Sequence, residues 1–600
     1  MNKKEVCRLT FACGLILSSQ AGFAQSTAQS NKADVVQTYT RGSIQGVVTD
    51  RNGDTLPGAS VYVKGNAKSG TVTDINGKFA IKAKAGDVLV VSYVGFDQLE
   101  VKVPATEGAL TVVLHDGANS LDQVVVVGYG VQKKSVLSSA VSRITSEDLD
   151  LGHPTNVQNA LKGKVSGVQI TSNSGQPGAD SKIRIRGTGT VNDSDPLYIV
   201  DGLPAENGIN NLNPSDIESI EILKDAASAA IYGARGANGV VLVTTKKGAK
   251  GKTKFNYEFT YGIQNPSKKL DLLGSADYQM LMNEMASNSG KAPYFATPST
   301  VNTDWQKVLQ NKNAPIINHK FTLSGGTDNS TYYASFGYIK QEGIFAKGYS
   351  DYERYNARLN YSNTLLDTKR RNWLNKVVFG AVTSYSKSIQ KGSSIGNSEV
   401  GGLMASIDML PPTEPVYQTD ADVLAQYDIT YPNHVVAPNG KVYNIIEMRE
   451  ICNPLADMQV NHNERTIPQN FGGNFSLDVD VLPGLKFRTT YGTEWVFNSI
   501  KSVTPVYDLN ATNKNTTSTI IDRKRESLFW QWENVLNYTH SFGLHNIGAM
   551  AGTSMSSYHY ENLEGQDYNL LATSLKKGYI DTATAAEEMS KVWGGASDHK

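Results

Sequence analysis

The second half of this chain is dominated by segments in which apolar and polar side chains alternate one by one. In "KFNYEFTYG" (254–262), aromatic rings at positions 255, 257, 259 and 261 are separated by Asn256, Glu258 and Thr260. A period of two places these two sets on opposite faces of a β-strand. Nine segments between Lys252 and Gly565 follow this pattern. With 54 glycines and 29 tyrosines among 600 residues, the chain is predicted to be mainly β.

The N-terminus has the pattern of a cleaved signal peptide. A basic lead precedes the apolar run "LTFACGLIL" (9–17), and small residues follow up to Ala24. Residues 1–24 are therefore predicted to direct export and to be removed after Ala24. Residues 25–42 are polar and are predicted to form a linker. No later apolar run approaches the roughly 20 residues of a membrane-spanning helix, which leaves a soluble protein or a β-barrel.

The alternating segments favour the barrel. Each fits a tilted membrane strand of about 10 residues, with its apolar face toward lipid and its polar face toward a lumen. Short turns such as "LPGL" (482–485) alternate with long polar connections such as residues 388–469, as periplasmic turns and external loops do. Residues 249–600 are therefore predicted to form the N-terminal part of a transmembrane antiparallel β-barrel. Residues 582–600 are polar and loop-like, so we expect the chain to be truncated inside an external loop.

Two smaller domains are predicted before the barrel. Residues 43–116 contain about seven short β segments separated by turn signals, which is typical of a small β-sandwich. Residues 135–248 mix helical and strand patterns, which fits a compact α+β domain. In "SKIRIRG" (181–187), Arg184 and Arg186 lie on one strand face. They could meet an anionic ligand or anchor the domain against a barrel wall.

The composition and motifs exclude several classes of function. The 57 basic and 57 acidic residues cancel, which removes the electrostatic basis for nucleic-acid binding. Without the signal peptide only Cys452 is left, so no internal disulfide can form. The nine histidines show no zinc-site spacing, and no nucleophile elbow is present. "GAKGKT" (248–253) lacks the first glycine of a phosphate-binding loop, and "GARGANG" (233–239) has the spacing of turns. We expect no catalytic, metal or cofactor site and no enzyme.

The order of these parts and five motifs resemble the SusC/RagA family of TonB-dependent outer-membrane transporters. The motifs are "LDQVVVVGYGVQKK" (121–134), "ALKGKVSGVQI" (160–170), "IRIRGTGT" (183–190), "DPLYIVDGLP" (195–204) and "IESIEILKDAASAAIYGARGANGVVLVTTKKG" (217–248). The resemblance implies a carboxypeptidase-regulatory-like domain at 43–116, a Ton box segment at 117–134 and a plug domain at 135–248. It also implies an outer-membrane barrel, which in this family has about 22 strands around a plugged lumen.

The resemblance implies that the valine run between the two small domains is the segment that TonB binds to deliver energy. By resemblance, the Ton box comprises Asp122, Gln123, Val124, Val125, Val126, Val127, Gly128 and Tyr129. TonB of the TonB-ExbB-ExbD complex would add it as a strand to its own sheet. A β-branched run without local structure suits such main-chain pairing. The family commonly has Glu where this chain has Gln123, a difference that main-chain pairing tolerates. The run also fits an ordinary edge strand.

The resemblance implies TonB-driven import of a nutrient too large for porins, with a SusD-like surface lipoprotein that closes over the barrel. An oligosaccharide is the favoured cargo, with peptides or iron chelates as alternatives; a non-transporting surface adhesin is the rival from another class. Candidate substrate residues lie in two plug loops, 172–180 and 206–211, where Gly and Asn favour an exposed, adaptable backbone. These residues are Asn173, Gln176, Asn207, Asn210 and Asn211. Either loop is equally suited to pack against the barrel wall.

Overall fold

The computed structural model of the chain describes residues 43–599, with gaps at 51–52, 65, 85, 94–95, 97, 105–109, 115–123, 128–129, 134–140, 151–154, 173–174, 191–193, 226–228, 369–372, 393–401, 449–450, 462, 544, 574–575 and 585–589. The predicted signal peptide (1–24) and linker (25–42) lie outside the described residues. The chain forms two compact units, one up to Asp122 and one from Gln123 onward.

The first unit is the expected β-sandwich. Its seven strands are β1 (Ser43–Thr49), β2 (Ser60–Val63), β3 (Asn66–Val72), β4 (Lys78–Lys82), β5 (Val88–Ser92), β6 (Leu99–Lys102) and β7 (Leu110–Val113). They form two sheets, in the orders β4-β1-β7 and β3-β2-β5-β6. Alternation along β4 buries Phe79 and Ile81 and leaves their neighbours exposed. These two side chains share one core with Leu89 and Leu114, which come from the other parts of the sandwich.

The plug in the second unit is an α+β fold, as predicted. Its elements are β10 (Val141–Thr145), α2 (Ser146–Asp150), α3 (Val157–Ala160), β11 (Val168–Ser172), β12 (Ser181–Ile185), β13 (Leu197–Val200), β14 (Leu203–Pro204), η2 (Pro214–Asp216), β15 (Ile217–Leu223), η3 (Ala230–Gly236) and β16 (Val240–Thr245). Five strands form a sheet in the order β10-β15-β16-β13-β14, and β11 pairs with β12. Strands β15 and β16 are buried on both faces, which suits the apolar run of β16, whereas β15 also buries Ser219 and Glu221.

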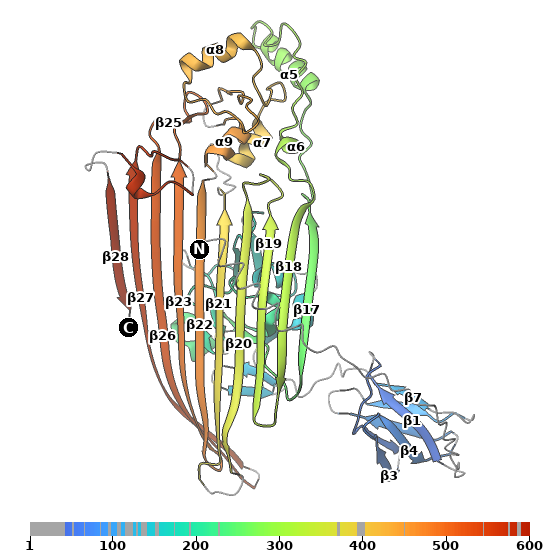
Figure 1. Cartoon of the computed structure of the whole chain (residues 1–600). Coiled ribbons are helices and arrows are strands. Elements are labelled where there is room, and N and C mark those ends of the chain that lie inside the picture. Colours follow the sequence, from blue (N-terminus) through green and yellow to red (C-terminus); the bar gives the residue numbers. More distant parts are fainter. Residues whose placement is uncertain are drawn as a thin grey trace, which may run out of the picture. The chain divides into compact units, whose positions relative to one another are not determined.

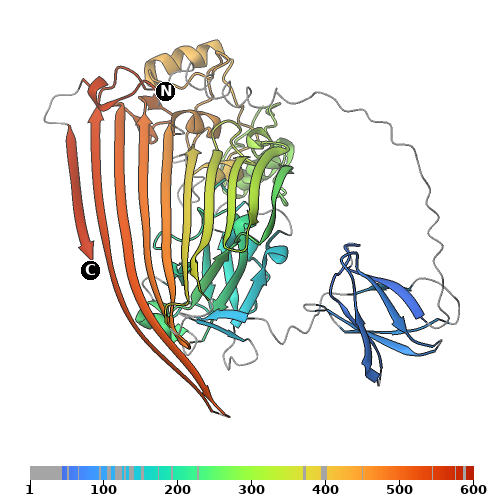
Figure 2. The same ribbon diagram turned by 60° about the horizontal axis from the view of Figure 1, so that its bottom comes forward.

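The remainder of the second unit contains one antiparallel sheet of 10 strands that curves around the plug (Figures 1 and 2). The strands are β17 (Gly251–Gln264), β18 (Ala314–Gly326), β19 (Ser330–Glu342), β20 (Asp351–Asp367), β21 (Lys376–Lys391), β22 (Glu464–Leu482), β23 (Leu485–Thr504), β26 (Thr519–Phe542), β27 (His545–Tyr568) and β28 (Lys591–His599). Each strand pairs with the next in this order. All nine alternating segments are strands of this wall, which confirms the predicted partial barrel.

Two expectations about these strands were wrong. The first nine strands are longer than about 10 residues, from 13 residues in β18 to 24 in β26 and β27. In addition, Lys591–His599 within the expected loop 582–600 pairs with β27 as strand β28. Both differences have one cause: a β-ladder is made of main-chain groups, so pairing continues where the side chains no longer alternate.

The two faces of the wall separate apolar from polar side chains, as the alternation predicts. On β17, Phe255 and Phe259 are 68% and 53% exposed. On β20, Arg354, Arg358 and Asn360 are buried against the plug. A polar lumen face and an apolar outer face are the pattern of a barrel in lipid.

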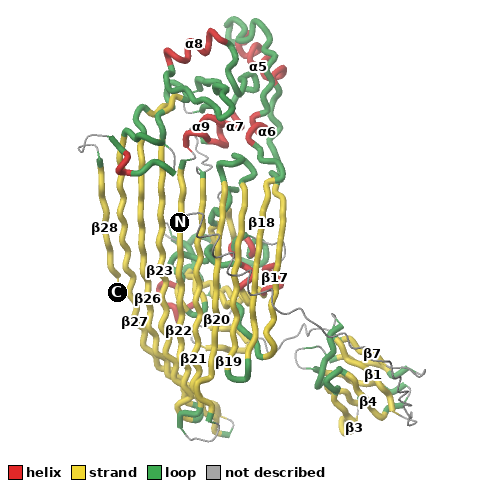
Figure 3. The backbone as a smooth tube through the Cα atoms, in the orientation of Figure 1, coloured by secondary structure: helices red, strands yellow, loops and turns green. Residues whose placement is uncertain are grey.

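The long connections of the wall gather at the end opposite to its short turns (Figure 3). They carry α5 (Ser275–Asn288), α6 (Trp305–Leu309), α7 (Leu403–Met409), α8 (Ala421–Thr430), α9 (Pro454–Asn461), β24 (Tyr507–Asp508), β25 (Lys514–Asn515) and η4 (Ile580–Thr582). The expected connection 388–469 is shorter, because β21 continues to Lys391 and β22 begins at Glu464. In the described ranges, none of the helices has the length and apolar character needed to cross a membrane.

Four of these connections fold together into what we call the cap: residues 265–313, 343–350, 392–463 and 505–518. One buried cluster joins Trp305 and Leu309 to Ala346 and Ile407. A second joins Cys452 and Val460 to Tyr507 and Leu509. The cap therefore has a hydrophobic core of its own, although its sequence was predicted to be polar connection.

Candidate functional site between the plug and the barrel wall

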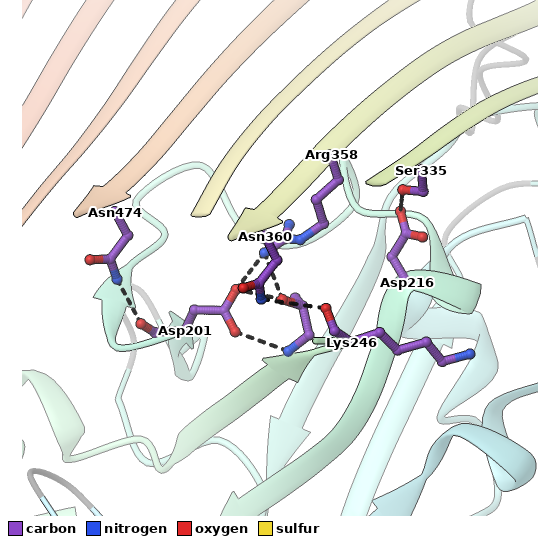
Figure 4. Close-up of polar contacts among 8 residues, drawn as sticks. Asp201, Asp216, Lys246, Ser335, Arg358, Asn360 and Asn474 are labelled. Carbon is purple, nitrogen blue, oxygen red and sulfur yellow. Dashed lines mark hydrogen bonds and ion pairs between the residues drawn. The ribbon is translucent and has the colours of Figure 1, made fainter. Parts of the chain in front are cut away.

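Asp201 ties the plug to the wall (Figure 4). It follows β13 in a tight turn, with a φ of 49°, a left-handed conformation that a short polar side chain tolerates. Its carboxylate accepts hydrogen bonds from the Thr245 N–H and hydroxyl at 2.9 and 2.7 Å. It also forms an ion pair with Arg358 of β20, while its main-chain carbonyl accepts the Asn474 amide of β22 at 2.7 Å. One residue thus connects two plug strands to two wall strands.

Asp216 makes a second attachment at the end of η2. Its carboxylate lies 3.1 Å from the Nζ of Lys320 on β18. The hydroxyls of Tyr333 and Ser335 on β19 donate to the same carboxylate at 2.9 and 3.0 Å. The two charged side chains are only 5% and 8% exposed. Removal of one partner would leave the other charge buried without a counter-charge. Loss of either attachment is therefore strongly destabilising.

A third set of contacts joins wall side chains to main-chain carbonyls of the plug. Arg354 of β20 donates to the carbonyls of Asn210 and Thr155 at 2.7 and 3.0 Å. Asn356 donates to the carbonyl of Asn211 at 2.6 Å. Loop carbonyls buried without such partners would lose hydrogen bonds to water. The wall therefore supplies the hydrogen bonds that irregular plug segments need.

These contacts place the predicted cargo loop 206–211 against the wall. The Asn207 side chain donates to Glu494 of β23 at 3.3 Å. The main-chain carbonyls of Asn210 and Asn211 hold β20 as described above. The geometry supports the packing alternative for this loop, and contact with cargo stays a prediction.

The other predicted cargo loop, 172–180, also approaches β20. Asn173 lies outside the described residues, and the main-chain carbonyl of Gln176 accepts a hydrogen bond within the loop. Gly178 lies so close to Tyr352 that an added Cβ would be 2.2 Å from the ring. Asp180 accepts a hydrogen bond from loop 206–211, and burial raises the pKa of its carboxyl. The two loops are thus brought together.

The suggestion that Arg184 and Arg186 anchor the plug to the barrel wall was wrong, and contact with an anionic ligand stays a prediction. Arg184 forms an ion pair with Asp195, and Arg186 pairs with Asp225 at 2.5 Å. All four residues belong to the plug, so these charges hold the plug together and do not reach the wall. The attachments to the wall come from Asp201 and Asp216, which sequence reasoning missed. The Asp-Gly turn after "PLYIV" was the one signal that could have identified the first of them.

The predicted Ton box is partly a hairpin. Val124–Val127 form β8, which pairs antiparallel with β9 (Gly130–Lys133). The expected lack of local structure is therefore wrong for the four valines, because their main chain pairs with that of β9. Asp122, Gln123, Gly128 and Tyr129 lie outside the described residues. Within the part of the chain that the structure describes, β8 and β9 pair only with each other, and such a hairpin is marginally stable in water.

Metal binding finds no support in the described ranges, where no three His, Cys, Asp or Glu side chains are grouped to hold an ion.

Comparisons with known proteins match both small domains and the wall. Residues 133–240 match the family model of the TonB-dependent receptor plug domain, and residues 44–126 match that of the CarboxypepD_reg-like domain. TonB-dependent receptor P26 of Formosa agariphila is 35% identical over 536 residues, which are 88% of this chain and 50% of the relative. TonB-dependent receptor SusC of Bacteroides thetaiotaomicron is 30% identical over 546 residues, 88% of this chain and 51% of the relative. The chain spans about half the length of the curated relatives it matches.

A solved structure shares the fold. The RagAB peptide importer in its open-open state superimposes with a TM-score of 0.64 and 24% identity, over 79% of this chain and 53% of that one. A plug fastened inside a curved antiparallel wall is the architecture of TonB-dependent receptors. Among them, this chain belongs to the SusC/RagA family.

Proposed function

We propose that this chain is part of a transporter that imports a large nutrient across the outer membrane with energy delivered through TonB. The observation that supports this best is the fastening of the plug. Asp201 and Asp216 each hold a buried cation of the wall, Arg358 and Lys320. A plug held in this way closes the lumen at rest, so passage requires work on the plug. A surface adhesin would not require a plug that closes the lumen.

The two ends of the wall suit the two sides of an outer membrane. Short turns such as the one at Gly484, where φ is 81°, belong on the periplasmic side. The cap belongs outside, where a SusD-like lipoprotein would close over it. The predicted signal peptide, residues 1–24, would direct the chain to this location.

Energy coupling is assigned to residues 122–129. TonB would pair with the main chain of this segment, and β8 already has the strand conformation that pairing needs. The β8–β9 hairpin leaves main-chain groups at the edges of its two-stranded sheet. Strand addition from the periplasm is thus compatible with the hairpin.

An oligosaccharide is the favoured cargo. Sugars are held by aromatic faces and by uncharged polar side chains, and the near-neutral chain is rich in Tyr, Asn and Ser. Gln176, Asn207, Asn210 and Asn211, with Asn173, remain the candidate plug residues for cargo. Peptides, for which the RagAB importer is named, and iron chelates are the alternatives.

Uptake by cells that depend on the complete transporter tests this proposal. Growth would be measured on a panel of glycans, peptides and iron chelates, in strains with and without TonB. We expect growth on at least one glycan class only when both TonB and the transporter are present. Growth that is indifferent to TonB would refute the coupling, and TonB-dependent growth on peptides alone would correct the cargo.

A further inference from the structure

A cavity of about 610 Å³ lies between the plug and the wall, next to the fastened region. On the plug side it is bounded by β13, by the turn into β14 and by η3, which contributes Tyr232 and Arg235. On the wall side it is bounded by β22, β23, β26 and β27. Its size falls within the roughly 300–1,000 Å³ of small-molecule sites.

The position of the cavity follows from how the plug is fastened. The plug contacts described above end on strands from β18, which carries Lys320, to β23, which carries Glu494. The cavity starts beside β22 and β23 and continues along β26 and β27. The plug is thus tied to one part of the wall and stands away from the next part. A molecule that passes the plug meets fewer attachments along β26 and β27.

The lining carries no net charge. Three cationic side chains, Arg235, Lys486 and Arg488, face three anionic ones, Asp201, Asp478 and Glu533. Several are already paired: Arg488 forms two hydrogen bonds to Asp478, one of them 2.9 Å long, and Asp201 holds Arg358. A charged ligand would have to separate such pairs, which disfavours it.

The remaining lining suits hydroxyl groups. Its uncharged polar side chains are Thr490, Gln531, Asn537, Ser554, Ser556 and Tyr232. Leu197, Ile199, Gly202, Pro204, Ile231 and Val535 complete the lining. Hydroxyl and amide groups both donate and accept hydrogen bonds, as sugar hydroxyls do. Burial, with a smaller contribution from the nearby Glu533 carboxylate, raises the pKa of Tyr232 to about 12, so its phenol keeps its proton at neutral pH and presents an uncharged ring.

We infer that this cavity is an internal cargo site, which holds an uncharged, hydroxyl-rich ligand between the plug and strands β22 to β27 during passage. The inference rests on the proposed import function and adds to it the side of the plug that the cargo takes. It also assigns ligand binding to uncharged polar residues that take no part in the contacts between plug and wall described above.

Cysteine labelling on β27 tests the site. Ser554→Cys and Ser556→Cys place a thiol in the cavity by a nearly isosteric change. Met555→Cys, between them, is the matched control, because Met555 is 60% exposed and is not part of the cavity lining. The native Cys452 is buried at 2% exposure and should not react with a bulky reagent. Each variant of the complete transporter would be treated with a bulky maleimide, and uptake and surface binding of a labelled neutral oligosaccharide would be measured.

We expect the reagent to reduce oligosaccharide uptake at least tenfold in S554C and S556C, to leave uptake by M555C unchanged, and to leave surface binding unchanged in all three. Full uptake by labelled S554C and S556C would overturn the inference, and so would loss of charged-peptide uptake with oligosaccharide uptake intact. If the unlabelled variants and the unmodified protein show no TonB-dependent uptake at all, the proposed function fails instead.

Discussion

Arg358 of the wall and Asp201 of the plug form an ion pair although 157 residues separate them in the chain. Their side chains are 5% and 9% exposed, and both also bind the Thr245 hydroxyl. Two buried charges with shared hydrogen bonds fix one arrangement of plug and wall, because any displacement leaves a charge without its partner.

Arg358→Met is expected to destabilise the seated plug by about 3–5 kcal/mol, since the Asp201 carboxylate then stays buried without its cation. Chemical denaturation of the complete transporter would measure the loss. Lys250→Met is the control: Lys250 pairs with Asp328 at 3.4 Å, but the two side chains are 65% and 94% exposed, so the loss should stay below about 1 kcal/mol. Equal losses in the two variants would contradict the assignment.

The double variant Arg358→Met with Asp201→Asn should be less destabilised than the sum of the two single variants. Asn tolerates the left-handed backbone of position 201 and no longer requires a cation. A double-mutant cycle on the same denaturation data gives the coupling. Strict additivity would mean that the two side chains do not interact.

Deletion of residues 122–129 should abolish uptake and leave cargo binding to the complete transporter intact. Proline at both Val125 and Val126 should do the same, because proline removes the N–H groups needed for strand pairing. The readouts are uptake by intact cells and equilibrium binding to purified protein. Persistent uptake in either variant would show that the segment is structural.

Shortening loop 206–211 tests its two possible roles. If it contributes to a cargo site, cargo affinity falls when the loop is shortened and also falls in Asn207→Ala, which removes one hydrogen bond to Glu494 at 3.3 Å. We expect affinity to fall at least threefold in both. If only the stability of the plug changes, the loop serves packing, in agreement with its contacts to β20.

The plug should lose stability as the pH rises because of Glu221. The Glu221 side chain is 1% exposed, and this burial raises the pKa of its carboxyl. The hydrogen bond from Ser219 at 2.8 Å and the charge of Arg143 lower the pKa by less. A raised folded-state pKa means that the folded plug binds more protons than the unfolded chain. The contribution of Glu221 to the free energy of unfolding is therefore complete below the ordinary glutamate pKa of 4.5, and it disappears as the pH rises through the folded-state pKa.

Glu221→Gln should flatten this part of the pH profile of unfolding. Glu147→Gln on α2 is the control, because position 147 is exposed and its carboxylate is not among the groups that shift the pKa of Glu221. Parallel profiles for the two variants would rule out Glu221 as the source.

Trp305→Ala should loosen the cap by about 3–5 kcal/mol, since its ring is 2% exposed in the cluster with Ile407. Limited proteolysis should then cut the connection 392–463 faster. Trp373→Ala, at a site 61% exposed, should leave the cleavage rate unchanged. A resistant cap in the Trp305 variant would mean that the cluster does not hold it.

The sequence predicted those parts of the fold that rest on local pattern. Alternation along segments such as Phe255–Tyr261 identified nine wall strands, and turn signals identified the sandwich. Strand β28 was missed because its pairing with β27 depends on main-chain groups and not on side-chain order. The Asp201–Arg358 and Asp216–Lys320 pairs were missed because nothing local links residues more than 100 positions apart.

The shared core of the cap has a consequence for how this protein can diverge. Because Ala346, Ile407 and Trp305 come from three different connections and pack in one cluster, a substitution in one connection changes the fit of the others. Exchange of a single connection between related genes would leave a mismatched core, whereas exchange of all four together would preserve it. We therefore expect the cap to change either by exchange of all four connections together or by compensating pairs of mutations in different connections.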